Sequence, residues 1–497
     1  MSKPYKAFTF VDLFAGIGGF RLGLESLGGA CIGFSEVDTQ AVRTYTQNFD
    51  TTSEAALGDI RSVKQFPVHI NLLVGGVPCQ SWSIAGKNRG FDDPRGALWG
   101  DTVRLVESTQ PDAFVFENVK GLADPRHTTE RTHLLRCFAE AGYAVWMGVL
   151  DSQHFGLPQS RKRIYFVGMR TESQKRAFAR HFRLLGAHEF APSHIYPSPS
   201  LAHVLGLDLR TEHVPRPPQA DLFGETSDRV TSTRVTGGAF DYVIFNDIRN
   251  GHATVHSWDL ADVSPVEQRI CQTLLENRRN RCYGPRDGNP LTREHLADLL
   301  PDLSRAALND AVDRLTDRRI LWDVRYDALE ERKLEDDEPA LLGHPAEHRI
   351  EFVNSRISSG IRVSDYLAAP AAEDIVYRIF LPDATAFGTL TASGSKDFVA
   401  LETLRGVSPV DFKRTFVERI VRPRHYRALT PREHARLQGF PDTFAIHPSP
   451  SVSNRQMGNA VSVPVIRALG QLLLDVGAVG GMYNASGLRS KVSAMNA

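Results

Sequence analysis

The chain has few cysteines, and they form no recognisable motif. Its 497 residues include five cysteines: Cys31, Cys79, Cys137, Cys271 and Cys282. The number is odd and no two of them make a C-x-x-C pair, which argues against a disulfide framework and against a structural zinc site. We therefore expect a protein of a reducing compartment that holds no metal, and each cysteine has to be considered separately.

Net charge and long apolar runs are also missing. Lysine and arginine number 58, as do aspartate and glutamate, so the overall charge does not point to a nucleic-acid partner. No apolar run reaches the length of a membrane span, and no signal-peptide pattern precedes Phe8. These absences predict a cytoplasmic protein without a membrane partner. Arginines gather at 278–281 and 414–427, where contact with phosphates and an ordinary charged surface are both open interpretations.

From Phe8 to Gly168, apolar strands alternate with helical segments, which predicts βαβ units and a doubly wound, mainly parallel sheet whose last strand is Arg161–Gly168. The first strand, Phe10–Phe14, leads into the glycine-rich turn Ala15–Phe20, where small residues let the backbone approach a ligand. This spacing differs from the dinucleotide pattern G-x-G-x-x-G, although a dehydrogenase remains an alternative.

Acidic residues end the next two segments. Glu36 follows the strand-like Ala30–Ser35 and is suited to bind the two hydroxyls of a ribose, while Asp59 is suited to accept a hydrogen bond from an adenine amino group. Together with the glycine-rich turn, they indicate an adenosine-type cofactor.

Three further features carry potential chemistry. Cys79 lies in a loop after the apolar strand Asn71–Gly75, although most cysteines are simply small buried hydrophobes. Glu117 lies in an apolar strand, which raises the pKa of a carboxyl group and lets it donate a proton; the alternative is a carboxylate that caps a turn. Arg161 and Arg163 are two residues apart and so lie on one face of a strand. A solvent-exposed, charged edge of the sheet would show the same pattern.

Taken together, these stretches resemble the DNA cytosine-5 methyltransferases of bacterial restriction-modification type. The resemblance rests on D-L-F-A-G-I-G-G-F at 12–20, P-C-Q-S-W-S at 78–83, E-N-V at 117–119 and Q-S-R-K-R at 159–163. It continues in R-A-L-T-P-R-E-H-A-R-L-Q-G-F-P at 427–441 and Q-M-G-N-A-V at 456–461. It covers residues 8–170 and 427–475 and leaves a long unmatched middle.

The resemblance implies an S-adenosylmethionine-dependent methyltransferase fold that flips a cytosine out of duplex DNA and methylates its carbon 5. Cys79 would attack carbon 6, Glu117 would contact ring nitrogen 3, Arg163 would hold the base carbonyl with Arg161 beside it, and Asn118 would fix the loop. The implied cofactor-binding residues are Phe14, Ala15, Gly16, Gly18, Glu36, Asp59, Ile60, Pro78, Asn459 and Val461. The implied DNA-binding residues are Gln80, Ser83, Thr389 and Leu390. Val37 stands where many relatives place a large aromatic residue over the adenine.

We expect a catalytic domain at 1–170 that is completed by 454–475, a mixed target recognition domain at 171–426, a hinge at 427–453 and a mobile tail at 476–497. Within the recognition domain, apolar periodicity predicts three helices, around Val266–Leu274, Leu296–Leu300 and Leu308–Leu315, and then a strand at Ile320–Val324. This pattern at 263–326 resembles a winged helix. Its third helix either enters a major groove or serves as a docking surface.

Other functions stay open from sequence alone. A relative of this family uses the same motifs on transfer RNA, although the long middle region favours duplex DNA as the substrate. A non-catalytic DNA-binding regulator is a further alternative, which the intact Cys79, Glu117 and Arg163 disfavour. A partner restriction endonuclease or defence-system proteins would accompany a restriction-modification enzyme.

Overall fold

The computed structural model describes residues 8–64, 66, 68–78, 98–207, 242–245, 254–255, 257–261, 263–277, 280–283, 291–326, 347–352, 377–392, 397–404 and 409–480. The chain forms two compact units. The first contains Met1–Asp241, Pro382–Ser395 and Ala428–Ala497, and the second contains Tyr242–Leu381 and Lys396–Arg427. Each unit is described by itself below.

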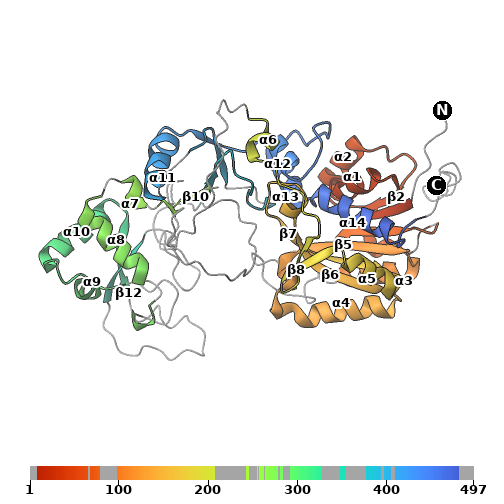
Figure 1. Cartoon of the computed structure of the whole chain (residues 1–497), viewed down its shortest axis with the longest axis horizontal. Coiled ribbons are helices and arrows are strands. Elements are labelled where there is room, and N and C mark those ends of the chain that lie inside the picture. Colours follow the sequence, from red (N-terminus) through yellow and green to blue (C-terminus); the bar gives the residue numbers. More distant parts are fainter. Residues whose placement is uncertain are drawn as a thin grey trace. The chain divides into compact units, whose positions relative to one another are not determined.

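The first unit is built on a nine-stranded sheet with the order β3-β2-β1-β4-β5-β7-β6-β9-β8 (Figure 1). Its strands are β1 (Phe8–Leu13), β2 (Gly29–Ser35), β3 (Ala55–Ala56), β4 (Leu72–Gly76), β5 (Ala113–Val119), β6 (Ala144–Asp151), β7 (Lys162–Met169), β8 (Phe182–Gly186) and β9 (Glu189–Pro192). The first five strands in this order, β3, β2, β1, β4 and β5, pair in parallel with their neighbours. Strand β7 lies between β5 and β6 and runs antiparallel to both. The predicted α/β fold with a mainly parallel sheet is confirmed.

The sheet extends beyond its predicted last strand. Strand β9 pairs in parallel with β6, and β8 pairs antiparallel with β9, so two strands follow β7 in the chain. The prediction that the sheet ends at Gly168 is therefore wrong. Strands β8 and β9 are short, carry Arg183 and Glu189 among apolar residues, and are largely exposed or half-buried, unlike the central strands, which are buried on both faces.

Helices cover both faces of the sheet because the side chains of each strand alternate between two apolar clusters. On one face, Phe10 and Val74 pack with α1 (Gly19–Glu25), α5 (Glu172–Ala179) and α14 (Val463–Asp475). On the other face, Val11 and Leu73 pack with α3 (Leu98–Thr109) and α4 (Thr128–Glu140). Helix α2 (Thr39–Asn48) adds Tyr45, which stacks on Phe34 at 4.4 Å between ring centroids.

The C-terminal helix α14 closes the core that the N-terminal segment opens. A Cβ on Gly23 of α1 would lie 3.0 Å from Cβ of Ile466, so the two helices approach closely. Residues 450–475 are long and apolar enough to suggest a membrane span by composition. They form two helices, however, α13 (Pro450–Asn459) and α14, and α14 buries Ile466 and Leu469 in the core. This segment is therefore accounted for as a core element.

The remaining elements of the first unit are short. They are α6 (Leu201–Leu205), α12 (Pro431–Leu437) and the 3-10 turns Ile60–Ser62, Lys120–Ala123, Pro125–His127 and Ser152–His154. Helix α12 begins with a capping box in which Thr430 and Glu433 satisfy each other's backbone amides.

The second unit contains a five-stranded sheet and a separate helical cluster. The sheet order is β11-β10-β14-β15-β16, from Thr254–Val255, Tyr242–Phe245, Tyr377–Phe380, Phe398–Ala400 and Tyr426–Ala428 respectively. Helix α7 (Ser257–Leu260), helix α11 (Pro409–Phe416) and the π-helix Val417–Val421 also belong to this unit.

The helical cluster has the element order of a winged helix. Helices α8 (Pro265–Asn277), α9 (Arg293–Leu299) and α10 (Arg305–Asp317) are followed by β12 (Leu321–Tyr326), and all four lie where the periodicity predicts them. Strand β13 (Glu347–Phe352) pairs antiparallel with β12, and Leu291 before α9 bridges to Ile350 of β13. Ile350 is part of the same apolar cluster as the three helices, so this module continues past residue 326 to Phe352.

Candidate functional site

The glycine-rich turn after β1 adopts a backbone that suits ligand approach. Phe14, Gly16 and Gly18 have φ angles of 52°, 54° and 91°, a conformation that glycine adopts readily and phenylalanine rarely. The Ala15 amide donates to Ser35 O at 2.8 Å, and the Gly16 amide donates to Glu36 Oε2 at 2.9 Å. Glu36 therefore ties the end of β2 to the turn.

Asp59 and Ile60 begin a 3-10 turn next to this edge of the sheet. Asp59 accepts hydrogen bonds from the Arg61 amide at 3.0 Å and from Arg61 Nε, and these bonds lower the pKa of its carboxyl group. Ile60 is buried, and its carbonyl accepts from Arg104 Nη2 at 2.9 Å. Val37, the residue after Glu36, is 68% exposed.

The end of α13 joins the same region. Val461 packs against the glycine-rich turn so closely that a Cβ on Gly19 would lie 2.8 Å from its Cγ2 atom. Asn459, two residues earlier, is exposed at the last position of α13. The first and last motifs of the chain thus meet at the end of β1.

Asp12 provides a test of whether this region fits a polar ligand. Its carboxyl group is fully buried, and neither oxygen has a hydrogen-bond partner among the described residues. Burial raises the pKa of Asp12 well above its ordinary value. A buried polar group without a partner is costly. The turn, the Glu36 carboxylate and Asp12 therefore suit a ligand with hydroxyl groups or positive charge.

Glu117 lies at the end of β5 beside Arg163 of β7. Arg163 Nε is 3.0 Å from Glu117 Oε1, and both side chains are largely buried. Burial raises the pKa of Glu117 against the opposing attraction of Arg163 and Arg161. A carboxyl group held in this way is able to donate a proton at higher pH than a solvated one.

Cys79, Gln80 and Ser83 lie outside the described residues, but the start of their loop is described. Gly76, the last residue of β4, pairs with Glu117, and a Cβ on Gly76 would lie 3.6 Å from Glu117 Oε2. The Val77 amide donates to Glu117 O at 3.1 Å, and Asn118 Nδ2 donates to Val77 O at 3.1 Å. The chain therefore leaves β4 directly beside Glu117, through Pro78.

Arg161 and Arg163 have different hydrogen-bond and ion-pair partners. Arg161 is 3% exposed, and its guanidinium donates to the carbonyls of Leu390, Gly458 and Ala460. Thr389 and Leu390, predicted to contact DNA, pack on the first unit: Leu390 is 2% exposed, and Thr389 Oγ1 donates to Ser160 O. Arg161 thus binds backbone carbonyls, whereas Arg163 pairs with Glu117.

Several site-supporting residues were not predicted. Gln159 Nε2 donates to Leu437 O at 3.2 Å, and Gln438 Nε2 donates to Met457 O at 2.9 Å, and both glutamines are fully buried. Behind the glycine-rich turn, Arg21 forms a buried ion pair with Glu54. The two glutamines could have been found from the sequence because they lie in the matched motifs. Glu54 could not, because its segment has no apolar periodicity that would predict burial.

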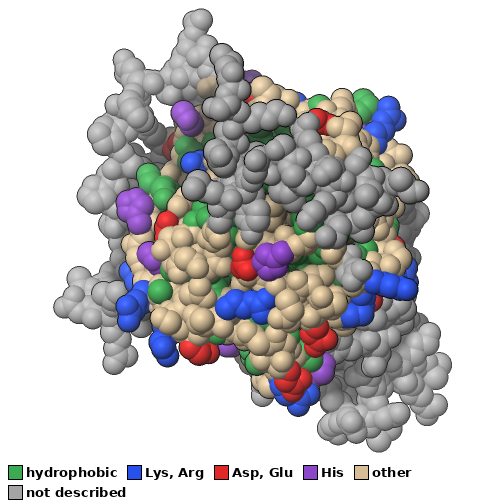
Figure 2. All heavy atoms as spheres, turned by 90° about the vertical axis from the view of Figure 1, so that its right-hand side faces the viewer, with side chains coloured by type: hydrophobic (Ala, Val, Ile, Leu, Met, Phe, Trp, Pro, Cys, Tyr) green, Lys and Arg blue, Asp and Glu red, His purple; other side chains and the backbone are tan. Residues whose placement is uncertain are grey.

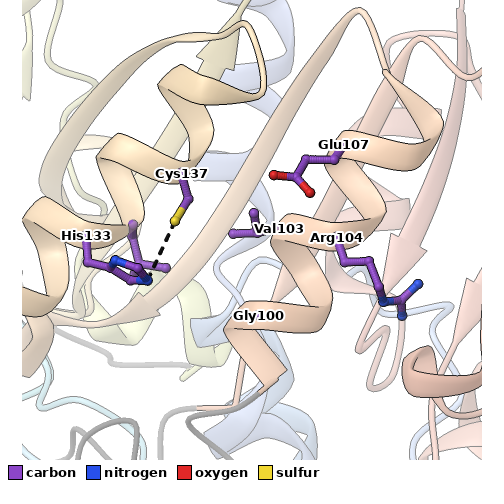
Figure 3. A pocket seen from close by; sticks show the side chains of 7 residues that line it. Gly100, Val103, Arg104, Glu107, His133 and Cys137 are labelled. Atoms are coloured by element: carbon purple, nitrogen blue, oxygen red, sulfur yellow. Dashed lines mark hydrogen bonds between the residues drawn. The ribbon is translucent and has the colours of Figure 1, made fainter.

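A cavity of about 410 Å³ lies away from these residues, between α3 and α4. Figure 3 shows Cys137 and His133 on one side and Val103, Arg104 and Glu107 on the other, with Cys137 Sγ 3.6 Å from His133 Nε2. Burial raises the pKa of the Cys137 thiol, which makes it a poorer nucleophile than a free thiol. None of the predicted site residues lines this cavity.

Charged side chains of both signs share the face of the molecule in Figure 2, where the described lysines and arginines are interspersed with acidic and uncharged residues. The arginines predicted to meet phosphates are only partly described. Arg278 and Arg279 lie outside the described residues, whereas Arg422 and Arg424 are exposed.

Comparison with known proteins identifies the family. The family model described as C-5 cytosine-specific DNA methylase matches residues 8–261 and 381–474. The type II methyltransferase M.HgiBI of Herpetosiphon aurantiacus is 41% identical over 470 residues, which cover 94% of this chain and 96% of that protein. M.HpaII of Haemophilus parainfluenzae is 44% identical over 177 residues, 35% of this chain and 49% of that protein.

Among solved structures, a Spodoptera frugiperda DNMT2 mutant aligns at 14% identity with a TM-score of 0.47, covering 94% of this chain and 99% of that one. The family match and the relative at 41% identity decide the assignment. The non-catalytic regulator, the dehydrogenase and the transfer-RNA enzyme are accordingly set aside. The chain belongs to the C-5 cytosine-specific DNA methylase family, and it is an enzyme that methylates cytosine in DNA with S-adenosylmethionine as the methyl donor.

Proposed function

We propose that this enzyme methylates carbon 5 of a flipped cytosine through a covalent adduct with Cys79, and that Glu117, Arg163 and Asn118 assist the reaction. The observation that carries this proposal is the Glu117–Arg163 pair at 3.0 Å, beside the point where the Cys79 loop leaves β4. A thiol and a protonated carboxyl group at one site are the two groups that addition to the cytosine ring needs.

In the first step, the Cys79 thiolate forms a bond to carbon 6 while Glu117 gives its proton to ring nitrogen 3. Electron density then builds at carbon 5, which accepts the methyl group. A water molecule then takes the carbon 5 proton, the sulfur–carbon bond breaks so that Cys79 leaves as the thiolate, and nitrogen 3 returns its proton to Glu117. Arg163 orients Glu117 and stabilises its carboxylate after the proton has left, because the two side chains are in contact away from bulk water.

S-adenosylmethionine supplies the methyl group when it is bound. We assign its site to the glycine-rich turn with Phe14, Ala15, Gly16 and Gly18, to Glu36, Asp59, Ile60 and Pro78, and to Asn459 and Val461. Glu36 is suited to bind the ribose hydroxyls, because its carboxylate lies at the end of β2 in contact with the turn. Support for this assignment comes from the packing of Val461 on Gly19 and from the buried, unpartnered Asp12.

We further propose that the enzyme belongs to a type II restriction-modification system and acts on duplex DNA at the nucleoid in the cytoplasm. M.HgiBI and M.HgiCII, each 41% identical over 94% of this chain, carry the name type II methyltransferase. A cognate endonuclease that recognises the same DNA site would then be its functional partner.

A mechanism-based trap tests the proposed roles. Duplex DNA that carries 5-fluorocytosine at the target should form a covalent complex after methyl transfer, because fluorine replaces the proton that must leave before the thiol is expelled. The complex should require S-adenosylmethionine, vanish with Cys79→Ala and fall strongly with Glu117→Gln, which cannot supply the proton. The readout is a slow band of labelled DNA on a denaturing gel.

The target sequence for this experiment comes from bisulfite sequencing of DNA from cells that express the enzyme. A covalent band that forms equally well with Cys79→Ala would assign the nucleophile to another residue. A Glu117→Gln variant that traps DNA at the wild-type rate would remove Glu117 from the proposed mechanism while leaving Cys79 in place.

A further inference from the structure

Arg161 connects three chain segments that are far apart in sequence. Its Nη1 donates to Leu390 O at 2.9 Å, and its Nη2 donates to Gly458 O at 2.9 Å and to Ala460 O at 2.8 Å. We propose that Arg161 is a positioning residue that couples segment 389–391, which contains the expected DNA-binding residues Thr389 and Leu390 and is called the recognition segment below, to the cofactor-side turn 458–460. This inference rests on the proposed function, because it uses the roles assigned there to Asn459 and Val461.

On the cofactor side, the two acceptor carbonyls belong to Gly458 and Ala460, the residues on either side of Asn459. Fixing both carbonyls orients the Gly458–Asn459 peptide unit and the Ala460–Val461 peptide unit. The next residue, Val461, packs on the glycine-rich turn at Gly19. A shift of the turn 458–460 would therefore displace both Asn459 and Val461, two of the proposed cofactor-binding residues.

On the target side, the segment that holds Leu390 is attached to the chain just before Arg161. Thr389 Oγ1 donates to Ser160 O, the Ser160 amide donates to Phe387 O at 2.9 Å, and the Phe387 amide donates to Pro158 O at 2.7 Å. Residues 382–395 belong to the first unit by their contacts, although the second unit precedes and follows them in the chain. Arg161 thus sits where the recognition segment meets the catalytic unit.

The two sides also touch each other directly. A Cβ on Gly458 would lie 2.2 Å from the backbone carbonyl carbon and oxygen of Thr391, so residues 391 and 458 pack without room for a side chain. Arg161 spans this junction with one planar group that offers several N–H donors in fixed directions. A lysine ammonium retains the charge but cannot reproduce that fork. Burial of the Arg161 charge makes these hydrogen bonds necessary.

The test is Arg161→Lys, measured in two ways. Affinity for S-adenosylhomocysteine is determined by calorimetry without DNA, and methylation at the cognate site is compared with sites that differ by one base pair. Loss of hydrogen bonds to charged groups should weaken the DNA-free affinity about tenfold. It should also raise methylation at the altered sites relative to the cognate one. A residue that acts only on the flipped cytosine would leave the DNA-free affinity unchanged.

Gly458→Ala reaches the same junction by another route, because its Cβ must displace the Thr391 backbone, and it should produce the same two defects. Lys162→Met is the matched control: Lys162 is the next residue of the chain and donates to Glu189 at 2.7 Å on a partly exposed surface. Exposed ion pairs contribute little, so this variant should stay within about twofold of wild type.

The inference is overturned if Arg161→Lys and Gly458→Ala bind S-adenosylhomocysteine and discriminate between sites as the wild type does. It is supported if both lose affinity and discrimination while Lys162→Met keeps them. Failure of the proposed catalytic roles would look different, since it would appear as covalent trapping by Cys79→Ala and would leave cofactor affinity unaffected.

Discussion

Arg21 and Glu54 form a buried ion pair behind the glycine-rich turn. Two guanidinium nitrogens of Arg21 donate to the two oxygens of Glu54 at 2.7 and 2.6 Å, and the guanidinium lies 4.3 Å from the centroid of the Phe49 ring. Burial raises the pKa of Glu54 to about 6, against the attraction of Arg21. The pair joins α1 to the segment after α2, and these helices flank the turn and Glu36.

This shift predicts a pH dependence of stability. Because the folded-state pKa of Glu54 exceeds its unfolded value, the folded protein binds the proton more tightly, and the stabilisation from Glu54 is lost as the pH rises from 4.5 to about 6. Relative to wild type, Glu54→Gln should therefore gain about 2 kcal/mol in free energy of unfolding between pH 4.5 and pH 7. Denaturant titrations of both proteins at several pH values measure this difference.

Gln and protonated Glu have similar shape and hydrogen-bonding capacity, so the comparison isolates the titration. A relative stability that falls as the pH rises would mean that the attraction of Arg21 outweighs burial and that the pKa of Glu54 is lowered instead.

Among the elements, the winged-helix module at 263–352 has an unusual charge for a DNA reader. Acidic residues outnumber lysine and arginine there by 19 to 14, whereas the whole chain is neutral. Helix α10, the third helix, exposes Asp310, Asp313 and Asp317. Its Arg314 is paired with Glu267 and with Asp310. Three carboxylates on this helix would face phosphates unfavourably in a major groove.

We therefore predict that removing the module does not flatten the salt dependence of DNA binding. Replacing 263–352 with a short flexible linker should change the slope of log affinity against log salt by less than about one unit, because a phosphate contact contributes roughly one unit. Arg305→Glu at the start of α10 should likewise bind DNA as the wild type does. The slope is measured by fluorescence anisotropy of labelled DNA at salt concentrations from about 50 to about 200 mM.

A slope that falls by two units or more on deletion, together with weaker binding of Arg305→Glu, would assign the module to DNA contact after all. An unchanged slope leaves its surface available for a protein partner, the other role that the sequence allows.

The same module shows what sequence reasoning could and could not reach. The helices were predictable because apolar residues recur at helical spacing within each helix, as Ile270 and Leu274 do in α8, and these residues are buried together. Strand β13 was not, because its pairing with β12 joins segments that are distant in the sequence, which no local pattern encodes. In the site, Glu117 and Arg163 were predictable from their motifs, but the three carbonyl partners of Arg161 depend on contacts between residues 161, 390 and 458–460.

At the scale of the whole molecule, the two units have separate apolar cores. The first unit buries Leu469 of α14 in the cluster on one face of its nine-stranded sheet. The second unit buries Leu315 of α10 in the cluster of the winged-helix module. Both leucines are fully buried, so they form a matched pair in chemistry and in burial. Chains with several cores often do not unfold in one two-state transition.

We predict that Leu469→Ala and Leu315→Ala destabilise different thermal transitions. Truncating a buried leucine to alanine costs about 2–5 kcal/mol, from lost burial and the cavity that remains. In differential scanning calorimetry, Leu469→Ala should lower the transition that S-adenosylhomocysteine raises, because the first unit carries the proposed cofactor site and a ligand stabilises the state that binds it. Leu315→Ala should lower a transition that the ligand does not move. The prediction is wrong if both substitutions shift one shared transition by the same amount. The two cores would then unfold together, which requires a coupling free energy between the units comparable to the stability of one core.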